Sequence, residues 1–239
     1  MGRLADRFSP RMRDAALLGS FFRWYKERVG SPEHLTATIE ATGIRDPRVL
    51  EAFRTIPREA FVPTRVVKRA YEDVPLPIPH EQVTTQPSLI ARMIEALALR
   101  GDERVLEIGT GYGFQTALLA FLAREVWSVE RFGDVARSAR ENLSSFGIDN
   151  VDVVTRDGSR GLPGPGPYQG IVVAAAFPQV PQPLADQLAA GGRLVQPIGP
   201  GGREEVTLFF EDGGQLVPSE VLTGAHFVRL VGKHGFAKG

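Results

Sequence analysis

The sequence predicts an α/β protein of the Rossmann-like, doubly wound class: a mostly parallel sheet with helices on both faces, an N-terminal helical extension and a closing antiparallel strand pair. Three observations lead to this prediction. Short apolar segments, typical of strands buried on both faces, alternate with segments of helical spacing. A glycine-rich turn joins one such strand to the next helix within residues 105–131. Near the C-terminus, two strand-like segments follow each other without a helix between them.

Two short helices are expected near the N-terminus, because Ser31 precedes Pro32 and Asp46 precedes Pro47, which are helix-start signals. Before them, residues 1–30 form a basic segment with apolar side chains along much of one helical side. This segment either docks on its own domain or serves as a dimer contact or a substrate cover. Docking is favoured, so a monomer is expected, with a dimer through residues 1–30 as the alternative.

A proline-rich segment over residues 57–87 follows these helices. Prolines at positions 63, 75, 77, 79 and 87 exclude regular helix there, except around Arg65–Tyr71. The segment is too apolar for disorder, so it should wrap the domain and bring its tail near the glycine turn. A helix over residues 87–99 then leads into the first strand.

The central unit begins with an apolar strand over residues 105–108. Gly109, Gly111 and Gly113 follow at alternate positions, where a tight turn needs positive φ and close backbone approach to a ligand. A helix over 117–122 and a second strand complete the unit, and the second strand ends in Glu130.

Two ligands fit such a unit, a dinucleotide and S-adenosylmethionine. Glu130 lies about 20 residues beyond the glycines, where a carboxylate binds the ribose hydroxyls. The glycine spacing is G-x-G-x-G, whereas a dinucleotide site has G-x-G-x-x-G. Glu107 precedes the turn and suits an ammonium or sulfonium charge better than phosphates. The residues therefore favour the methyl donor over the dinucleotide.

The remaining elements alternate in the same way. They are expected as a helix over 134–143, a strand over 151–155, a strand over 171–176, a helix over 181–189 and a strand over 191–198. Strands over 205–211 and 226–231 should then form the closing antiparallel pair, separated by the turn signals Gly213-Gly214 and Pro218.

Composition excludes several classes of function. Lys+Arg and Asp+Glu both number 28, so no basic field indicates nucleic acid. The chain has no Cys and four scattered His, so no metal site is expected. No apolar run approaches the roughly 18 residues of a membrane span. Residues 15–22 mimic a signal peptide, but basic and aromatic residues follow them directly, so we expect no membrane partner and a cytoplasmic protein.

Several segments resemble one family, the protein-L-isoaspartate (D-aspartate) O-methyltransferases of the class I methyltransferases. They are GIRDPRVLEAF with PREAFVP, AYEDVPLPI, VLEIGTGYGFQTALLA with VWSVER, RDGSRGLPG, and AAAFPQVPQPLADQLAAGGRLVQPIG. The likeness covers roughly residues 33–232. It implies two parts: residues 1–86, holding the N-terminal helices and the active-loop segment, and residues 87–239, forming the S-adenosylmethionine-binding methyltransferase core.

The resemblance implies methyl transfer from S-adenosylmethionine, leaving S-adenosylhomocysteine, to the free α-carboxylate of L-isoaspartyl residues. The ester collapses to a succinimide, which starts the repair of damaged proteins and peptides. The cofactor residues carried over from the family are Thr84, Glu107, Gly109, Thr110, Gly111, Gly113, Glu130, Arg131, Asp157 and Gly158. In this assignment the turn lies under the methionine part with Glu107 supporting it, Glu130 binds ribose beside Arg131, and Asp157 accepts from adenine beside Gly158.

The active loop departs from the family pattern G-x-G-Q-T-I-S-x-P. Here the corresponding residues are Pro79–Pro87, and Thr85 takes the place of the Ser usually assigned to catalysis. Thr keeps a hydroxyl that can bond a carboxylate. Both loop glycines are replaced, by Pro79 and Glu81, and Gln169, Phe177 and Arg229 also differ from the family pattern. These changes are expected to cluster on the substrate side.

Two other functions stay open beside protein repair. The first is a related carboxyl methyltransferase that acts on Asp of one dedicated peptide or protein partner. The second is a homologue that binds the cofactor without turnover. Activity on generic isoaspartyl peptides separates the repair enzyme from both.

Overall fold

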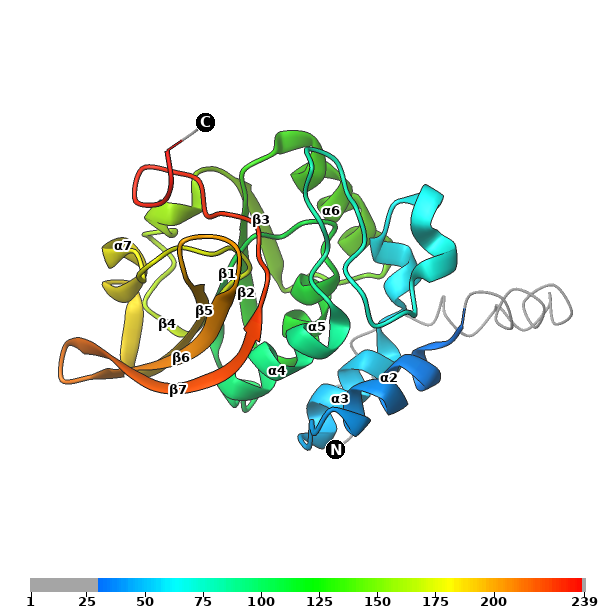
Figure 1. Ribbon diagram of the computed structural model, residues 1–239, viewed down its shortest axis with the longest axis horizontal. Coiled ribbons are helices and arrows are strands. Elements are labelled where there is room, and N and C mark those ends of the chain that lie inside the picture. The colour runs from blue at the N-terminus through cyan, green and yellow to red at the C-terminus, as the bar shows by residue number, and fades with distance from the viewer. Residues whose placement is uncertain (1–29, 238–239) are drawn as a thin grey trace, which may run out of the picture.

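The computed structural model describes residues 30–237 and forms one seven-stranded sheet in the order β3-β2-β1-β4-β5-β6-β7 (Figure 1). The first five strands pair in parallel, and the last two pair antiparallel. They are β1 (Arg104–Ile108), β2 (Glu125–Glu130), β3 (Val151–Thr155), β4 (Tyr168–Val173), β5 (Leu188–Ile198), β6 (Glu204–Asp212) and β7 (Gln215–Ala225). The predicted fold class is confirmed. The helix expected in residues 1–30, and the dimer contact proposed for it, lie outside the described residues.

The helix-start signals near the N-terminus act as predicted. Helix α2 (Pro32–Ala41) begins after Ser31, whose hydroxyl accepts a hydrogen bond from the His34 backbone N–H at 3.2 Å. Helix α3 (Pro47–Thr55) begins after Asp46, whose carboxylate accepts from the Arg48 N–H at 2.8 Å. Each cap satisfies one of the N–H groups that a helix start leaves without a partner.

Alternation along the strands divides the apolar side chains between two cores. Val105 points into the core that contains α2, α3, α4 (Pro87–Leu97) and α5 (Phe114–Leu122), whereas Leu106 points to the opposite face. Helix α6 (Gly133–Ser145) joins the first core through Leu143. The opposite core is closed by Leu162, near the 3-10 helix η6 (Gly158–Arg160), and by Leu184 of the short helix α7 (Gln182–Ala185).

The proline-rich segment packs on the domain as expected. It contains the 3-10 helices η4 (Arg58–Phe61) and η5 (Thr64–Arg69), followed by an irregular hairpin. The hairpin is held where the Thr84 N–H donates to the Leu76 carbonyl at 2.8 Å and the Ile78 N–H donates to the Gln82 carbonyl at 2.9 Å. Its second arm leads directly into α4, whose first turn begins at Pro87.

The prediction for the last strand was wrong. The strand after β6 is β7, residues 215–225, and not residues 226–231. Gly213 and Gly214 both have positive φ and form the two-residue turn that suits a hairpin, so the strand resumes at once. Pro218 is tolerated because β7 is an edge strand. Residues 226–231 pass instead beside the end of β4, where the Ala176 N–H donates to the Val228 carbonyl at 2.8 Å.

Two boundaries also differ around the fourth and fifth strands. The helix expected over 181–189 is shorter, because α7 ends at Ala185 and β5 already begins at Leu188, which joins the second core. Strand β4 begins at Tyr168, earlier than the expected start at Ile171, because Tyr168 pairs with Leu188.

Candidate active site

A cavity opens where the strand order reverses. β1 and β4 are neighbours, but the chain leaves β1 towards β2 and leaves β4 towards β5 on the other side. Ligand sites form at such switch points, outside the carboxyl ends of the strands. The first cavity comprises about 920 Å³ of empty space, including space open to solvent. Its walls come from the ends of β1 to β4, the arm of the proline-rich hairpin and residues 228–231.

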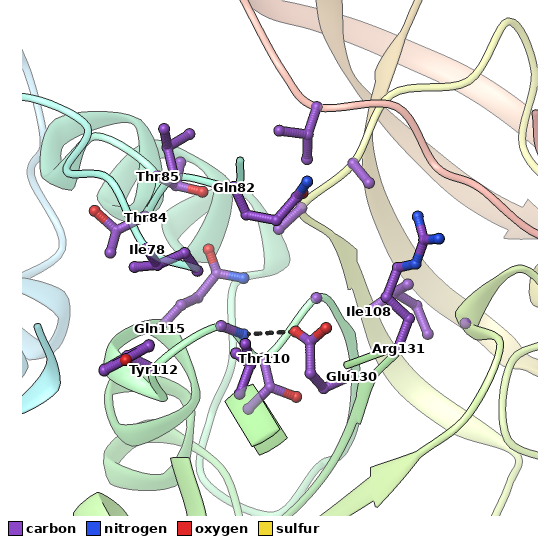
Figure 2. A pocket seen from close by; sticks show the side chains of 18 of the residues that line it. Ile78, Gln82, Thr84, Thr85, Ile108, Thr110, Tyr112, Gln115, Glu130 and Arg131 are labelled. Carbon is purple, nitrogen blue, oxygen red and sulfur yellow. Dashed lines mark hydrogen bonds between the residues drawn. The ribbon is translucent and has the colours of Figure 1, made fainter. Parts of the chain in front are cut away.

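The glycine turn after β1 forms the floor of this cavity. Gly109 has a φ of 100°, and a Cβ there would lie 3.3 Å from the Cβ of Ala174 after β4. The Gly111 N–H donates to Glu130 Oε2 at 3.0 Å, as Figure 2 shows. Gly113, with a φ of 93°, ends the turn and precedes α5. The turn therefore places bare backbone against the cavity.

Glu130 joins the turn to the loop after β2. Its side chain is 7% exposed, and its second oxygen accepts from the Phe132 N–H at 3.0 Å. Arg131 lies with its guanidinium 4.7 Å from the centre of the Phe132 ring. All three residues line the cavity. Each Glu130 oxygen uses one lone pair on backbone, so lone pairs are left for a ligand's hydroxyl groups.

Glu107 lies beneath the turn and not in the cavity wall. It is fully buried and accepts from the Thr116 hydroxyl at 2.5 Å and the Ser128 hydroxyl at 2.6 Å. Ser128 is in turn 2.5 Å from the hydroxyl of Thr110, which does line the cavity. Burial raises the pKa of Glu107 to about 7, although these hydroxyls lower it. Glu107 thus supports the turn through Ser128 and Thr110, and its predicted contact with the ligand stays a prediction.

Gln115, in the first turn of α5, was missed from the sequence. Its side chain lines the cavity but is 6% exposed, and neither atom of its amide group has a partner among the described residues. The available signal was a polar residue, next to Thr116, inside a mostly apolar helix over 114–122.

The Asp157-Gly158 pair lies at the end of β3, and its two members behave differently. Gly158 lines the cavity, and a Cβ there would lie 2.5 Å from Ile108 Cγ2, so glycine is required. Asp157 is absent from the cavity wall. Its carboxylate accepts from the Ser159 hydroxyl at 2.7 Å and from the Lys233 N–H at 2.8 Å. Burial would raise the Asp157 pKa, but these bonds hold it below its usual range.

The active-loop arm is positioned by Arg58, a second residue missed from the sequence. Arg58 is fully buried and donates to the carbonyls of Ala70, Glu72 and Val74 and, at 3.0 Å, to the Thr84 hydroxyl. Burial lowers its pKa to about 10, so it stays charged at neutral pH. Arg58 therefore fixes Thr84 by a charge-assisted hydrogen bond.

Thr85 stands where two cavities meet. Beside the first cavity lies a second one of about 1160 Å³, which runs between α4, the hairpin arm and the chain after β7. Both cavities are lined by Val83, Thr84, Thr85, Ala174 and Val228. Figure 2 shows Thr85 on the hairpin arm beside the first cavity, and the residue lines the second cavity as well. Within the described chain, the Thr85 hydroxyl has no hydrogen-bond partner.

The tip of the hairpin is tied to α6 at the cavity edge. His80 and Glu81 have φ values of 62° and 56°, a region that non-glycine residues rarely adopt. The His80 ring stacks on Phe132 with centroids 4.1 Å apart and lies 2.9 Å from the Asp134 carboxylate. The His80 hydrogen bond holds the Asp134 pKa below its usual range. Glu81 is exposed and outside both cavity walls, so its charge does not face the site.

Phe177 and Arg229 cluster with the C-terminal segment, not with the two-cavity junction. Phe177 meets Phe236 edge to face at 5.2 Å, and the Arg229 guanidinium lies 5.0 Å from the same ring. Arg229 borders the first cavity, whereas Phe177 is part of neither wall. The expectation that these departures cluster on the substrate side stays a prediction.

The first cavity has the donor set that S-adenosylmethionine needs. A carboxylate suited to ribose hydroxyls, bare backbone at the turn, and the unpartnered amide of Gln115 all face it. An orphaned buried amide is costly unless a ligand completes its hydrogen bonds. The described residues contain no group of three or more His, Asp or Glu that could hold a metal ion. Over residues 30–237, no helix has the length and apolarity needed to cross a bilayer.

Comparisons with known proteins agree with this geometry. The family model of protein-L-isoaspartate(D-aspartate) O-methyltransferase matches residues 31–235. Curated proteins named protein-L-isoaspartate O-methyltransferase are similar: that of Methanoculleus marisnigri is 50% identical over 83% of this chain and 90% of its own. Protein-L-isoaspartate O-methyltransferase 1 of Rhodopseudomonas palustris strain HaA2 is 49% identical over 83% of this chain and 82% of its own.

Solved structures show the same fold. A protein-L-isoaspartate O-methyltransferase matches with a TM-score of 0.75 and 32% identity, over 85% of this chain and 67% of its own. A Plasmodium falciparum protein solved with S-adenosyl-L-homocysteine matches with a TM-score of 0.72 and 20% identity, over 84% and 99%. The second likeness is informative for the fold alone.

Proposed function

Because the chain belongs to the protein-L-isoaspartate (D-aspartate) O-methyltransferase family, we propose that its two cavities hold the two reactants of that reaction. The enzyme methylates the free α-carboxylate of L-isoaspartyl residues in peptides and proteins, with S-adenosylmethionine as methyl donor. When bound, this cofactor supplies a methyl group on a positively charged sulfur. The carboxylate oxygen attacks the methyl carbon in line, and the sulfur is the leaving group.

The first cavity is the cofactor site in this proposal. The turn from Gly109 to Gly113, with Thr110, lies under the methionine part, and Glu130 accepts from the ribose hydroxyls beside Arg131. Gly158 offers its backbone to the adenine, and Asp157 next to it is assigned to the adenine amino group. Glu107 acts from beneath, through Ser128 and Thr110.

One observation carries the proposal: Thr85 lines both cavities at their junction. A carboxylate that enters from the second cavity meets the Thr85 hydroxyl before it reaches the floor of the first. The hydroxyl donates to one carboxylate oxygen and orients the other towards the first cavity. Thr84 does not compete for this role, because its own oxygen already accepts from Arg58 and from the Leu76 N–H at 3.0 Å.

The reaction requires placement more than acid–base help. A carboxylate with a pKa near 4 is ionised at neutral pH and needs no base. Orientation of oxygen, carbon and sulfur can supply several kcal/mol of the barrier. The buried Arg58 and its four acceptors make the loop arm rigid, and this rigidity provides the placement.

Thr85→Val and Thr85→Ser test the assignment. The valine variant removes the hydroxyl at nearly constant volume, and the serine variant keeps it. With an isoaspartyl peptide, Thr85→Val is expected to lose about tenfold or more in kcat/KM, whereas Thr85→Ser stays within a few-fold of the native enzyme. Calorimetry should show S-adenosylhomocysteine affinity unchanged in both. A valine variant with native turnover would remove Thr85 from the site.

The altered loop supports a second candidate, a carboxyl methyltransferase with one dedicated partner. Pro79 and Glu81 stand where the family pattern has glycines, and His80 binds the tip of the loop to Phe132 and Asp134 at the start of α6. A fixed tip suits a narrower range of substrates. Turnover of one partner's Asp, with no turnover of generic isoaspartyl peptides, would favour this candidate.

A further inference from the structure

Gln115 carries two unsatisfied buried polar atoms at the cofactor cavity. Its amide oxygen and nitrogen have no hydrogen-bond partner in the described chain, and the residue is 6% exposed. Leaving such a group unpaired costs free energy, and native proteins rarely do so without a reason. Because the side chain lines the cavity, a bound ligand can supply the missing partners.

The direction of the side chain shows which part of the ligand it meets. In Figure 2 the Gln115 amide points from α5 into the space between Tyr112 and the hairpin residues Ile78 and Gln82. Arg131 lies on the opposite side of the same view, with Glu130 between them. If Glu130 and Gly158 hold the adenosine, as proposed above, Gln115 faces the other end of the cofactor.

The chemistry of that end matches an amide. The amino-acid end of S-adenosylmethionine carries an α-ammonium, which donates, and an α-carboxylate, which accepts. A glutamine amide supplies one acceptor and two donors in a fixed plane. Gln115 also lies in the first turn of α5, where backbone N–H groups favour a carboxylate.

We propose that the Gln115 side chain binds the amino-acid end of the cofactor, with its carbonyl oxygen on the α-ammonium and its NH₂ group on the α-carboxylate. This inference rests on the proposed cofactor and adds a positioning residue to it. The amide also lies near Glu107 and helps to lower its pKa. Gln115 therefore links the cofactor's charged end to the polar group buried beneath the turn.

Calorimetry with two ligands tests the inference on the intact chain. S-adenosylhomocysteine has the amino-acid end, and 5′-methylthioadenosine lacks it. Gln115→Leu should lower the affinity for S-adenosylhomocysteine about tenfold or more, which is the loss expected for charge-assisted hydrogen bonds. The same variant should bind 5′-methylthioadenosine within about twofold of the native protein, because the adenosine contacts are unchanged.

Gln196→Leu is a matched control. Gln196 is also a buried glutamine with an unpartnered amide oxygen. Its NH₂ group donates to the Gln179 carbonyl, and the residue lies on β5 outside both cavities. Its replacement should leave both affinities unchanged. Thermal unfolding without ligand checks that both variants stay folded.

Each result decides the question. Selective loss of S-adenosylhomocysteine affinity in Gln115→Leu supports the inference. Unchanged affinity, or an equal loss for both ligands, overturns it, because the side chain would then be irrelevant or merely structural. If the native protein binds neither ligand, the proposed cofactor itself fails, and the inference fails with it. A raised peptide KM with native S-adenosylhomocysteine affinity would assign Gln115 to the substrate and would also overturn it.

Discussion

Replacing Glu107 by Gln should change how the stability of the ligand-free protein depends on pH. The Glu107 carboxyl is fully buried, and its pKa is raised from an ordinary 4.5 to about 7, with burial as the largest cause and the nearby Glu130 charge adding to it. Between these two values the folded state holds a proton that the unfolded state has released. Stability is therefore highest below pH 4.5 with respect to this group and falls as pH rises through 7.

The magnitude follows from the two pKa values. A difference of about 2.5 units at about 1.36 kcal/mol each gives a loss of about 3 kcal/mol once the pH is above 7. Glutamine has nearly the same shape, and its carbonyl oxygen can accept the bonds from Thr116 and Ser128. It does not ionise, so this loss should be absent in Glu107→Gln.

Urea unfolding at pH values from 5 to 8 measures the effect. The difference in unfolding free energy between the variant and the native protein should move by about 2–3 kcal/mol in favour of the variant across this range. Titrating groups that do not interact with Glu107 are common to both proteins and cancel in the difference. Parallel pH profiles for the two proteins would refute the argument, since they would mean that Glu107 has the same pKa folded and unfolded.

Three further substitutions have direct readouts. Glu130→Ala should lower the affinity for S-adenosylhomocysteine about tenfold or more in calorimetry, because the ribose hydroxyls lose their acceptor. Unchanged affinity would contradict the ribose assignment. Glu81→Gly should raise the unfolding free energy by up to about 1 kcal/mol in urea titrations, because glycine adopts a φ of 56° without strain; a destabilised variant would contradict this. Arg58→Met should lower stability by about 3 kcal/mol or more, because three carbonyls and the Thr84 hydroxyl lose a buried donor; a loss below 1 kcal/mol would show that water replaces it.

Local signals in the sequence predicted the elements that they control directly. Ser31 and Asp46 cap helices where expected, and the alternating glycines form the turn after β1. The last strand was misplaced because two glycines in succession could mark either a long connection or a two-residue hairpin turn. Pairing of β7 with β6 along its length decides between them, and pairing is a tertiary property.

Site residues could be predicted where a backbone motif fixes their position. They were harder to predict where their role depends on partners that are buried with them in the folded chain. Glu130 and Gly158 line the cavity because strand ends place them there. Glu107 and Asp157 belong to the same motifs, but the Glu107 carboxylate accepts from the Thr116 hydroxyl and the Asp157 carboxylate from the Lys233 N–H, and residue spacing alone does not show these bonds. Gln115 and Arg58 were missed because their importance comes from having, or lacking, partners in the folded chain.

Methyl transfer to a matched pair of short peptides tests the central claim most directly. The two peptides share one sequence and differ in a single isoaspartyl or normal aspartyl residue, and labelled S-adenosylmethionine is the donor. The two-cavity site, with Thr85 at the junction, predicts that the isoaspartyl peptide gains a labelled methyl ester that base removes. The normal aspartyl peptide should gain no label above background. Intact S-adenosylhomocysteine binding with no label on either peptide would contradict the claim that this junction methylates isoaspartyl carboxylates.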